Sequence, residues 1–219
     1  FLGFVDKIKY LEDNDGKYLV AIIDYKTGYV PTTLDNINYG LHLQLPVYIY
    51  LTKRGLHKDI KITGFYLQKI LNGKTVDSDS FEEDSKKALK LDGYSINSEE
   101  ELLKFDNTYT KSDVIKGMAT TSKGFAHYAK LFNDSDIDKI DEIVDERINE
   151  VVGAIEEGDF PINPKRVKGE LIGCEFCKYK EICYRKEEDI VDLEYKTRKD
   201  ILGDDDNAQV DEWTTGCHL

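Results

Sequence analysis

The stretch that decides the fold is Tyr18–Gly28, YLVAIIDYKTG. Its apolar run, Leu19–Ile23, predicts a short strand that is buried on both faces. The strand ends on Asp24, Tyr25 and Lys26. Because side chains alternate along a strand, Asp24 and Lys26 share one face, and Tyr25 points to the other. A carboxylate and an ammonium side by side at the end of a buried strand indicate either a surface ion pair or a functional site.

A hairpin is expected to join this strand to the residues before it. FVDKIKY (4–10) is strand-like, and the polar segment EDNDGK (12–17) contains the Asn, Asp and Gly residues that favour hairpin turns. If the turn is centred near Asp15, the numbers of cross-strand partners add up to about 30. This register predicts that Asp6 lies opposite Asp24.

Two opposed carboxylates repel one another across a hairpin. A divalent cation between Asp6 and Asp24, with Lys26 alongside, would turn this repulsion into attraction. The backbone carbonyl of Tyr25 could supply a further oxygen ligand. The hairpin therefore predicts a metal site for a hard cation such as Mg²⁺.

The composition limits the classes of function. A net charge of −13 argues against a protein that holds nucleic acid by a basic surface, but it allows contact with phosphate through metal ions or a partner subunit. No run of about 18 apolar residues occurs, so no membrane partner is expected. The four cysteines, three of them within ten residues, indicate a metal or cluster site in the reducing cytoplasm. The chain begins at Phe1 inside an apolar run, so we expect it to be part of a longer protein.

Apolar residues at nearly every position of 39–54 predict a largely buried helix, with Pro46 in its first turns. Gln44 and Tyr48 are four residues apart and share a helical face. They are either polar residues packed at the edge of a buried helix or part of a site.

The rest of the chain predicts strands first and helices afterwards. A strand at 61–71 and a short strand near Val76 would form a second hairpin. Helical periodicity then predicts helices at 81–90, 98–105, 123–132 and 136–157, and an acidic tail begins at about residue 186. The last helix is the clearest, because one apolar stripe runs along it until Gly158: Ile137, Ile140, Ile143, Val144, Ile148, Val151, Val152 and Ile155.

The cysteines form a second motif, Cys174-x₂-Cys177-x₅-Cys183. Three thiolates at this spacing predict a zinc site that lacks one ligand, or three ligands of an iron–sulfur cluster. Three buried but unligated cysteines are the alternative. Cys217 and His218, in the tail, could supply a fourth ligand.

Three segments in order resemble the PD-(D/E)XK nuclease superfamily: GFVDKI (3–8), IDYKTG (23–28) and the Q-xxx-Y pair at Gln44 and Tyr48. The resemblance is strongest to the RecB-like branch, and within it to the C-terminal nuclease domain of the AddB-type subunit of ATP-dependent helicase–nucleases. It implies an α/β, restriction-endonuclease-like fold with a mixed central sheet flanked by helices. The nuclease domain would occupy residues 1–185, and the acidic tail residues 186–219.

The resemblance also implies a role for each motif residue. Asp6 and Asp24 would hold Mg²⁺ or Mn²⁺, and Lys26 would be the catalytic lysine. Gln44 and Tyr48 would line the site. In these nucleases a further His or Glu lies on a helix upstream of the first strand, before the start of this chain.

The three-cysteine group is also similar to that of AddB-type proteins and of CRISPR-associated RecB-like exonucleases. There a fourth cysteine, upstream of the nuclease core, completes a [4Fe–4S] cluster. We therefore expect the full-length protein to carry such a cluster, and this piece to hold its three cysteines empty or differently ligated.

The function implied by the resemblance is a metal-dependent DNA exonuclease for double-strand break repair and recombination. It would cut single-stranded ends delivered by a helicase partner. Two alternatives remain open: a stand-alone exonuclease of the CRISPR-adaptation type, and an inactive nuclease fold that serves as a DNA-binding or assembly scaffold. The scaffold is disfavoured because Asp6, Asp24 and Lys26 are all present.

Overall fold

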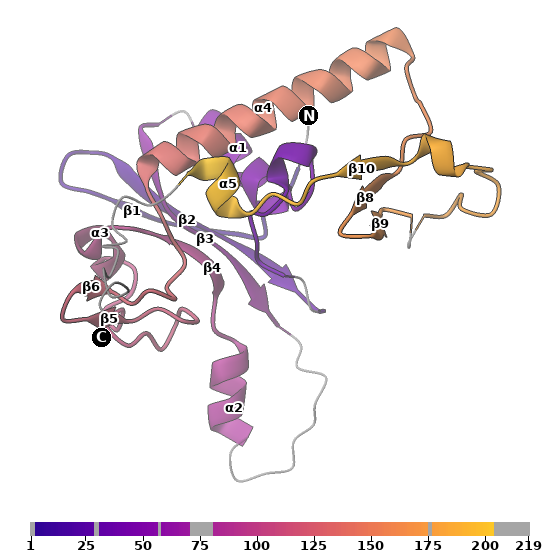
Figure 1. Cartoon of the computed structure of the whole chain (residues 1–219). Helices are drawn as coiled ribbons and strands as arrows, with labels where there is room; N and C mark the ends of the chain where they lie inside the picture. The colour runs from indigo at the N-terminus through magenta and orange to yellow at the C-terminus, as the bar shows by residue number, and fades with distance from the viewer. Residues whose placement is uncertain (1–2, 29–30, 57, 71–80, 175–176, 204–219) are drawn as a thin grey trace, which may run out of the picture.

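The structure is a computed structural model that describes residues 3–28, 31–56, 58–70, 81–174 and 177–203. A five-stranded sheet forms its centre, in the order β1-β2-β3-β4-β7 (Figure 1). The β2–β3 and β4–β7 pairs are parallel, and the β1–β2 and β3–β4 pairs are antiparallel. The expected mixed α/β sheet is thus confirmed. Its strands are β1 (Lys7–Glu12), β2 (Tyr18–Lys26), β3 (Ile60–Lys69), β4 (Asp92–Ile96) and β7 (Leu131–Phe132).

The hairpin of β1 and β2 has the predicted register. Lys7 pairs with Ile23 and Glu12 with Tyr18, so the partner numbers add up to 30. Strand β2 is buried from Leu19 to Asp24 because β1 and β3 flank it and both faces of the sheet are covered.

Helices and loops cover the two faces of the sheet differently. On one face α1, α4 and α5 pack over residues such as Ile22 and Phe65, which form the larger core (Figure 1). On the other face α3 and the segment after it pack over Ala21, Ile23 and Tyr66. The helices are α1 (Gln44–Gly55), α2 (Phe81–Ala88), α3 (Glu99–Leu103), α4 (Asp134–Glu157) and α5 (Arg198–Leu202), with 3-10 turns η1 (Ile37–Tyr39) and η2 (Glu187–Asp189). No helix in the described part of the chain is long and apolar enough to cross a membrane.

Helix α1 begins at Gln44, later than the predicted start near residue 39. Gly40 and His42 have φ values of +82° and +55°, and residues in this left-handed region do not continue a right-handed helix. Pro46 lies in the first turn, where its missing N–H has no partner in the helix to lose.

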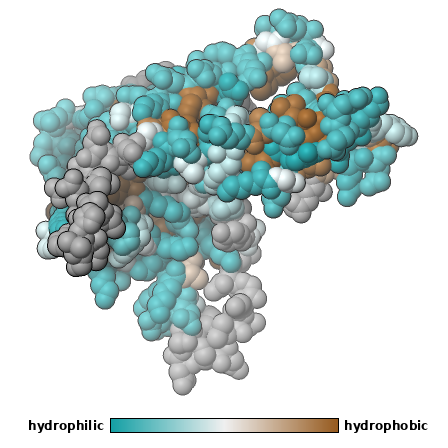
Figure 2. All heavy atoms as spheres, in the orientation of Figure 1, coloured by the Kyte–Doolittle hydropathy of each residue, from teal (hydrophilic) through white to brown (hydrophobic). Residues whose placement is uncertain are grey.

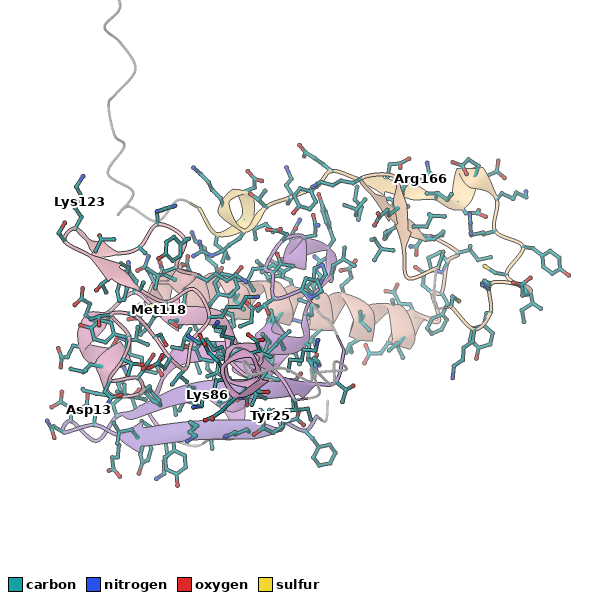
Figure 3. The ribbon with its side chains drawn as sticks, turned by 90° about the horizontal axis from the view of Figure 1, so that it is seen from below. Asp13, Tyr25, Lys86, Met118, Lys123 and Arg166 are labelled. Atoms are coloured by element: carbon teal, nitrogen blue, oxygen red, sulfur yellow. The ribbon has the colours of Figure 1, made fainter. Side chains whose placement is uncertain are left out.

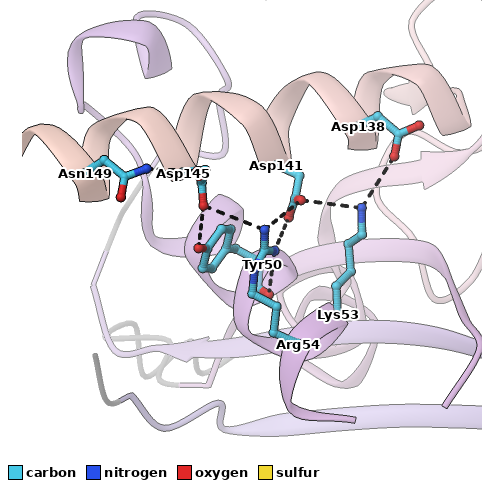
Figure 4. A network of polar contacts seen from close by, with 7 residues as sticks. All are labelled: Tyr50, Lys53, Arg54, Asp138, Asp141, Asp145 and Asn149. Carbon is cyan, nitrogen blue, oxygen red and sulfur yellow. Dashed lines mark hydrogen bonds and ion pairs between the residues drawn. The ribbon is translucent and has the colours of Figure 1, made fainter. Parts of the chain in front are cut away.

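Polar contacts join α1 to α4 beside the apolar core (Figure 4). The hydroxyl of Tyr50 donates a hydrogen bond to Asp145 Oδ1 at 2.7 Å. Arg54 Nη1 donates to Asp141 Oδ1 at 2.7 Å, and its guanidinium lies 3.4 Å from the centre of the Tyr50 ring. Part of the charged face of α4 therefore fixes α1, the helix that carries Gln44.

The long helix α4 is confirmed, and Gly158 ends it in the left-handed conformation. Only the first half of its apolar stripe is covered by the core. Ile140 and Val144 are fully buried, whereas Val151 and Ile155 are each 57% exposed. The second half of α4 extends past the central sheet, and brown apolar surface gathers around this end of the molecule (Figures 1 and 2).

A second sheet lies beyond the far end of α4. Its strands pair in the order β10-β8-β9, with β10 parallel and β9 antiparallel to β8. Figure 3 shows Arg166 in this sheet, well separated from Tyr25 at the end of the central sheet. The strands are β8 (Lys165–Val167), β9 (Glu170–Ile172) and β10 (Val191–Leu193).

Two predictions from the sequence were wrong. Residues 123–132 do not form a helix: they contribute β6 (Gly124–Phe125), which pairs with β5 (Thr120–Thr121), and β7 of the central sheet. The segment after residue 186 is not a tail as far as residue 203, because it forms η2, β10 and α5. The strand expected near Val76 and residues 204–219 lie outside the described residues.

Candidate active site

The residues predicted to form the site meet at the end of β2. Asp6, directly before β1, accepts a hydrogen bond through Oδ2 from the backbone N–H of Tyr25 at 2.9 Å. The ring of Tyr25 packs against the core on the opposite face. Asp6 is therefore held beside the peptide unit that follows Asp24, as the hairpin register predicted.

Asp24 is the most deeply buried charged group of the site, with 2% of its surface exposed. Its Oδ1 accepts a hydrogen bond from Gln44 Nε2 at 3.0 Å. Its Oδ2 lies 2.5 Å from Lys26 Nζ in an ion pair, and among the described residues it accepts no hydrogen bond. A buried carboxylate needs such compensation, because burial removes its hydration.

Gln44 links the site residues of α1 and β2. Its Nε2 also donates to the hydroxyl of Tyr48 at 3.0 Å, and its Oε1 accepts from Lys26 Nζ at 2.5 Å. This one amide therefore contacts Asp24, Lys26 and Tyr48. The polar contacts, rather than apolar packing, explain why Gln44 and Tyr48 share one face of the helix.

Lys69 is a candidate site residue that the sequence did not reveal. It pairs in register with Lys26 across the parallel β2–β3 ladder, and paired residues of adjacent strands lie on the same face of a sheet. Its side chain is exposed, so a second ammonium group lies one strand away from Lys26. Only the pairing of two distant strands places these lysines together.

The donor set fits a hard divalent cation. Mg²⁺ is usually bound through one or two carboxylates and keeps several waters, and Asp6 and Asp24 provide two carboxylates. Asp24 Oδ2, which accepts no hydrogen bond from the described residues, is suited to ligation. Nowhere in the described ranges do three or more His, Cys, Asp or Glu side chains form a group that could hold a metal. The protein therefore supplies a partial ligand set, as Mg²⁺ sites that also use water and phosphate do.

The cysteine motif does not form a ligand set in this structure. Cys174, Cys177 and Cys183 are free and partly exposed, and within the described residues they make no metal-binding group. The backbone N–H of Cys177 donates to the carbonyl of Cys174 at 3.3 Å, in a turn after β9. Cys217 and His218 lie outside the described residues. As it stands, this arrangement of thiols does not fit a zinc ion or a cluster.

The segment after β10 holds the loop that leads into α1. The hydroxyl of Tyr195 and the backbone N–H of Arg198 donate to the two carboxylate oxygens of Asp35, at 2.5 and 2.7 Å. The backbone of Lys196 exchanges two hydrogen bonds with Asn36, at 2.8 and 2.9 Å. The chain that follows the cysteines therefore helps to position the loop before Gln44.

This contact predicts a pH-dependent contribution to stability. Partial burial raises the pKa of Asp35, but the hydrogen bonds from Tyr195 and Arg198 outweigh it and hold the pKa below its ordinary value of 3.8. The stabilisation is therefore present above pH 3.8 and is lost as the pH falls through the lowered pKa. We expect Asp35→Asn to reduce the free energy of unfolding by about 1 kcal/mol at pH 7.

Urea unfolding of Asp35→Asn and wild type at several pH values measures this effect. The difference should shrink below about pH 4, where the wild-type carboxyl gains its proton. Asp159→Asn, at an exposed position, is the matched control. A difference of equal size at pH 7 and at about pH 3 would show that the charge of Asp35 is not its cause.

Residues 1–184 match the family model of the PD-(D/E)XK nuclease superfamily. The chain belongs to the PD-(D/E)XK nuclease superfamily. Several relatives of this PD-(D/E)XK chain are named as a subunit of an ATP-dependent helicase/deoxyribonuclease, the AddB-type protein, which confirms the more specific resemblance. The chain is 25% identical to the protein of Carboxydothermus hydrogenoformans over 85% of its own length, and 25% identical to that of Bacillus cereus strain AH187 over 91%. The protein of Lachnoclostridium phytofermentans is 26% identical over 83% of the chain.

The PD-(D/E)XK chain spans only 17–18% of the length of these relatives. The similarity therefore concerns one nuclease part of much longer proteins. Helicase activity and subunit partners belong to the whole relatives, as their names describe them.

Proposed function

We propose that this chain is the nuclease part of a helicase–nuclease and that it hydrolyses DNA from single-stranded ends with Mg²⁺ or Mn²⁺. The main support is the convergence of Asp6, Asp24 and Lys26 on one strand end, where Gln44 bridges the last two. Membership of a nuclease superfamily gives this convergence its chemical meaning. An inactive scaffold would have no need of a buried, ion-paired carboxylate at this position.

Each side chain has a distinct task in this proposal. Asp6 and Asp24 hold the cation, which when bound polarises the phosphate and lowers the pKa of a bound water. Lys26 now neutralises Asp24 Oδ2, so a cation at that oxygen would compete with the ammonium and release it toward the phosphate or the attacking water. Gln44 keeps Lys26 near the carboxylate during this exchange.

The acidic composition supports delivery of DNA by another part of the assembly. With a net charge of −13, the chain has no excess of positive charge with which to collect DNA from solution. We propose that a helicase feeds it single strands, in the repair and recombination of double-strand breaks. The names of the relatives favour this role over that of a stand-alone exonuclease of the CRISPR-adaptation type.

We also propose that Cys174, Cys177 and Cys183 contribute three ligands to a [4Fe–4S] cluster in the whole protein, with a fourth ligand from outside this chain. The x₂ and x₅ spacing supports this assignment, as does the partial exposure of all three thiols. The iron and sulfide content of the whole protein, purified without oxygen, tests it. A Cys183→Ser protein that retains the full content would contradict it.

Cleavage of end-labelled single-stranded DNA by the whole natural protein tests the nuclease proposal. We expect short products with Mg²⁺ or Mn²⁺ and a loss of at least about a thousandfold in rate when a chelator removes the metal. DNA binding without cleavage in the presence of either metal would instead support the inactive scaffold.

A further inference from the structure

A pocket lies directly beside the Asp24 site and shares Gln44 with it. Its volume is about 230 Å³. Its floor consists of buried apolar side chains of the sheet, including Phe65, Leu67 and Tyr94. Polar side chains, among them His42, lie at its edge. The pocket thus combines an apolar floor with a rim that can form hydrogen bonds.

The sheet register fixes where this pocket lies relative to Asp24. Leu67 in its floor is the β3 partner of Asp24, and partners in adjacent strands lie about 4.8 Å apart. Both side chains are on the face covered by α1. A group bound in the pocket therefore lies next to a phosphate positioned at Asp24 and Lys26, and within one nucleotide of it.

We propose that the pocket holds the base of the nucleotide adjacent to the scissile phosphate. This inference rests on the proposed nuclease function and adds a nucleobase subsite to it. The faces of a base are flat and apolar and its edge is polar, which matches the floor and the rim. A phosphate would not suit the floor, because contact with Phe65 and Leu67 would remove its hydration without supplying a partner.

The floor is suited to stacking. The rings of Phe65 and Tyr94 are stacked on each other, with centroids 5.3 Å apart and planes 24° apart. Stacking on aromatic side chains contributes to single-strand binding with little dependence on base identity, because every base has a π face. A nuclease that must accept any sequence needs a subsite of this kind.

The backbone of His42 adds a second observation. Its φ of +55° lies in the left-handed region, where a glycine would be less strained. The chain nevertheless carries an imidazole here, exposed at the edge of the pocket. We assign this ring to the polar edge or the face of the bound base.

The subsite also explains a preference for single strands. A base that occupies the pocket cannot remain paired and stacked in a duplex, so a duplex would first have to be opened. The pocket therefore selects against paired DNA without any contact to a second strand.

Single-stranded oligonucleotides with one abasic residue test this proposal on the whole protein. As cleavage proceeds, the abasic residue should slow the one step in which it faces the pocket by about tenfold or more, the size expected for one lost stacking contact. Steps several nucleotides away should be unaffected. Uniform cleavage through the abasic residue would overturn the pocket and leave the nuclease function intact. Failure to cut the intact oligonucleotide would refute the nuclease function itself.

A variant tests the same subsite from the protein side. His42→Gly removes the ring and relaxes the backbone, so it should slow cleavage of intact DNA and reduce the discrimination against the abasic step. His127→Gly, an exposed histidine on the other side of the sheet, is the control. If His42→Gly discriminates as wild type does, the ring takes no part in binding the base.

Discussion

Asp24→Asn is expected to reduce the rate of metal-dependent cleavage by at least about a thousandfold while the protein remains folded. Asparagine has the shape of aspartate and its amide can preserve a contact to Gln44, but it lacks the charge that holds a divalent cation and pairs with Lys26. A bound metal supplies several kcal/mol of charge stabilisation, which corresponds to a loss of this size.

The measurement is a single-turnover assay over a range of Mn²⁺ concentrations, with thermal unfolding as the test of folding. Lys26→Ala provides a comparison within the site. It should also cut slowly but should retain metal affinity, whereas Asp24→Asn should lose it. Asp113→Asn, an exposed control, should match wild type. A wild-type rate in Asp24→Asn would show that this carboxylate holds no essential metal.

Leu202→Ala is expected to reduce the free energy of unfolding by about 2–5 kcal/mol, the usual cost of a large cavity in a core. Leu202 is 2% exposed and belongs to the larger core together with Ile137 and Ile140. The acidic composition of its neighbourhood gives no sign of this, and a tail would tolerate the change. The result therefore tests directly whether the end of the described chain is part of the domain.

Urea unfolding of Leu202→Ala and of Leu103→Ala separates a buried leucine from an exposed one. Leu103 is 51% exposed on α3, so its truncation should change stability by no more than about 0.5 kcal/mol. Equal and small effects would place residue 202 outside the core.

Local patterns in the sequence were sufficient for much of the fold. The ends of α4 followed from its apolar period and Gly158, and Ser98 caps α3 as expected by accepting a hydrogen bond from the N–H of Glu101. Residues 123–132 were misread because β6 and β7 are only two residues long. Strands this short carry no periodicity of their own, and their conformation is set by the strands they pair with.

The sequence by itself determined the centre of the site. A buried run ending in Asp24-Tyr25-Lys26, joined by a short turn to the preceding strand, places Asp6 beside Asp24, because a tight turn fixes the register of a hairpin. Every contact needed for that inference lies within about twenty residues of chain.

Only the tertiary structure decided what surrounds that centre. Lys69 lies beside Lys26 through a parallel pairing, the apolar floor of the pocket comes from β3 and β4, and Asp35 is held by Tyr195 from 160 residues away. These contacts depend on how whole faces of the sheet and helices pack, and many pairings of distant segments satisfy the same local pattern. The fold selects one of them because it is the arrangement that buries the β2 and β3 side chains together with α1, α4 and Leu202 in a single core.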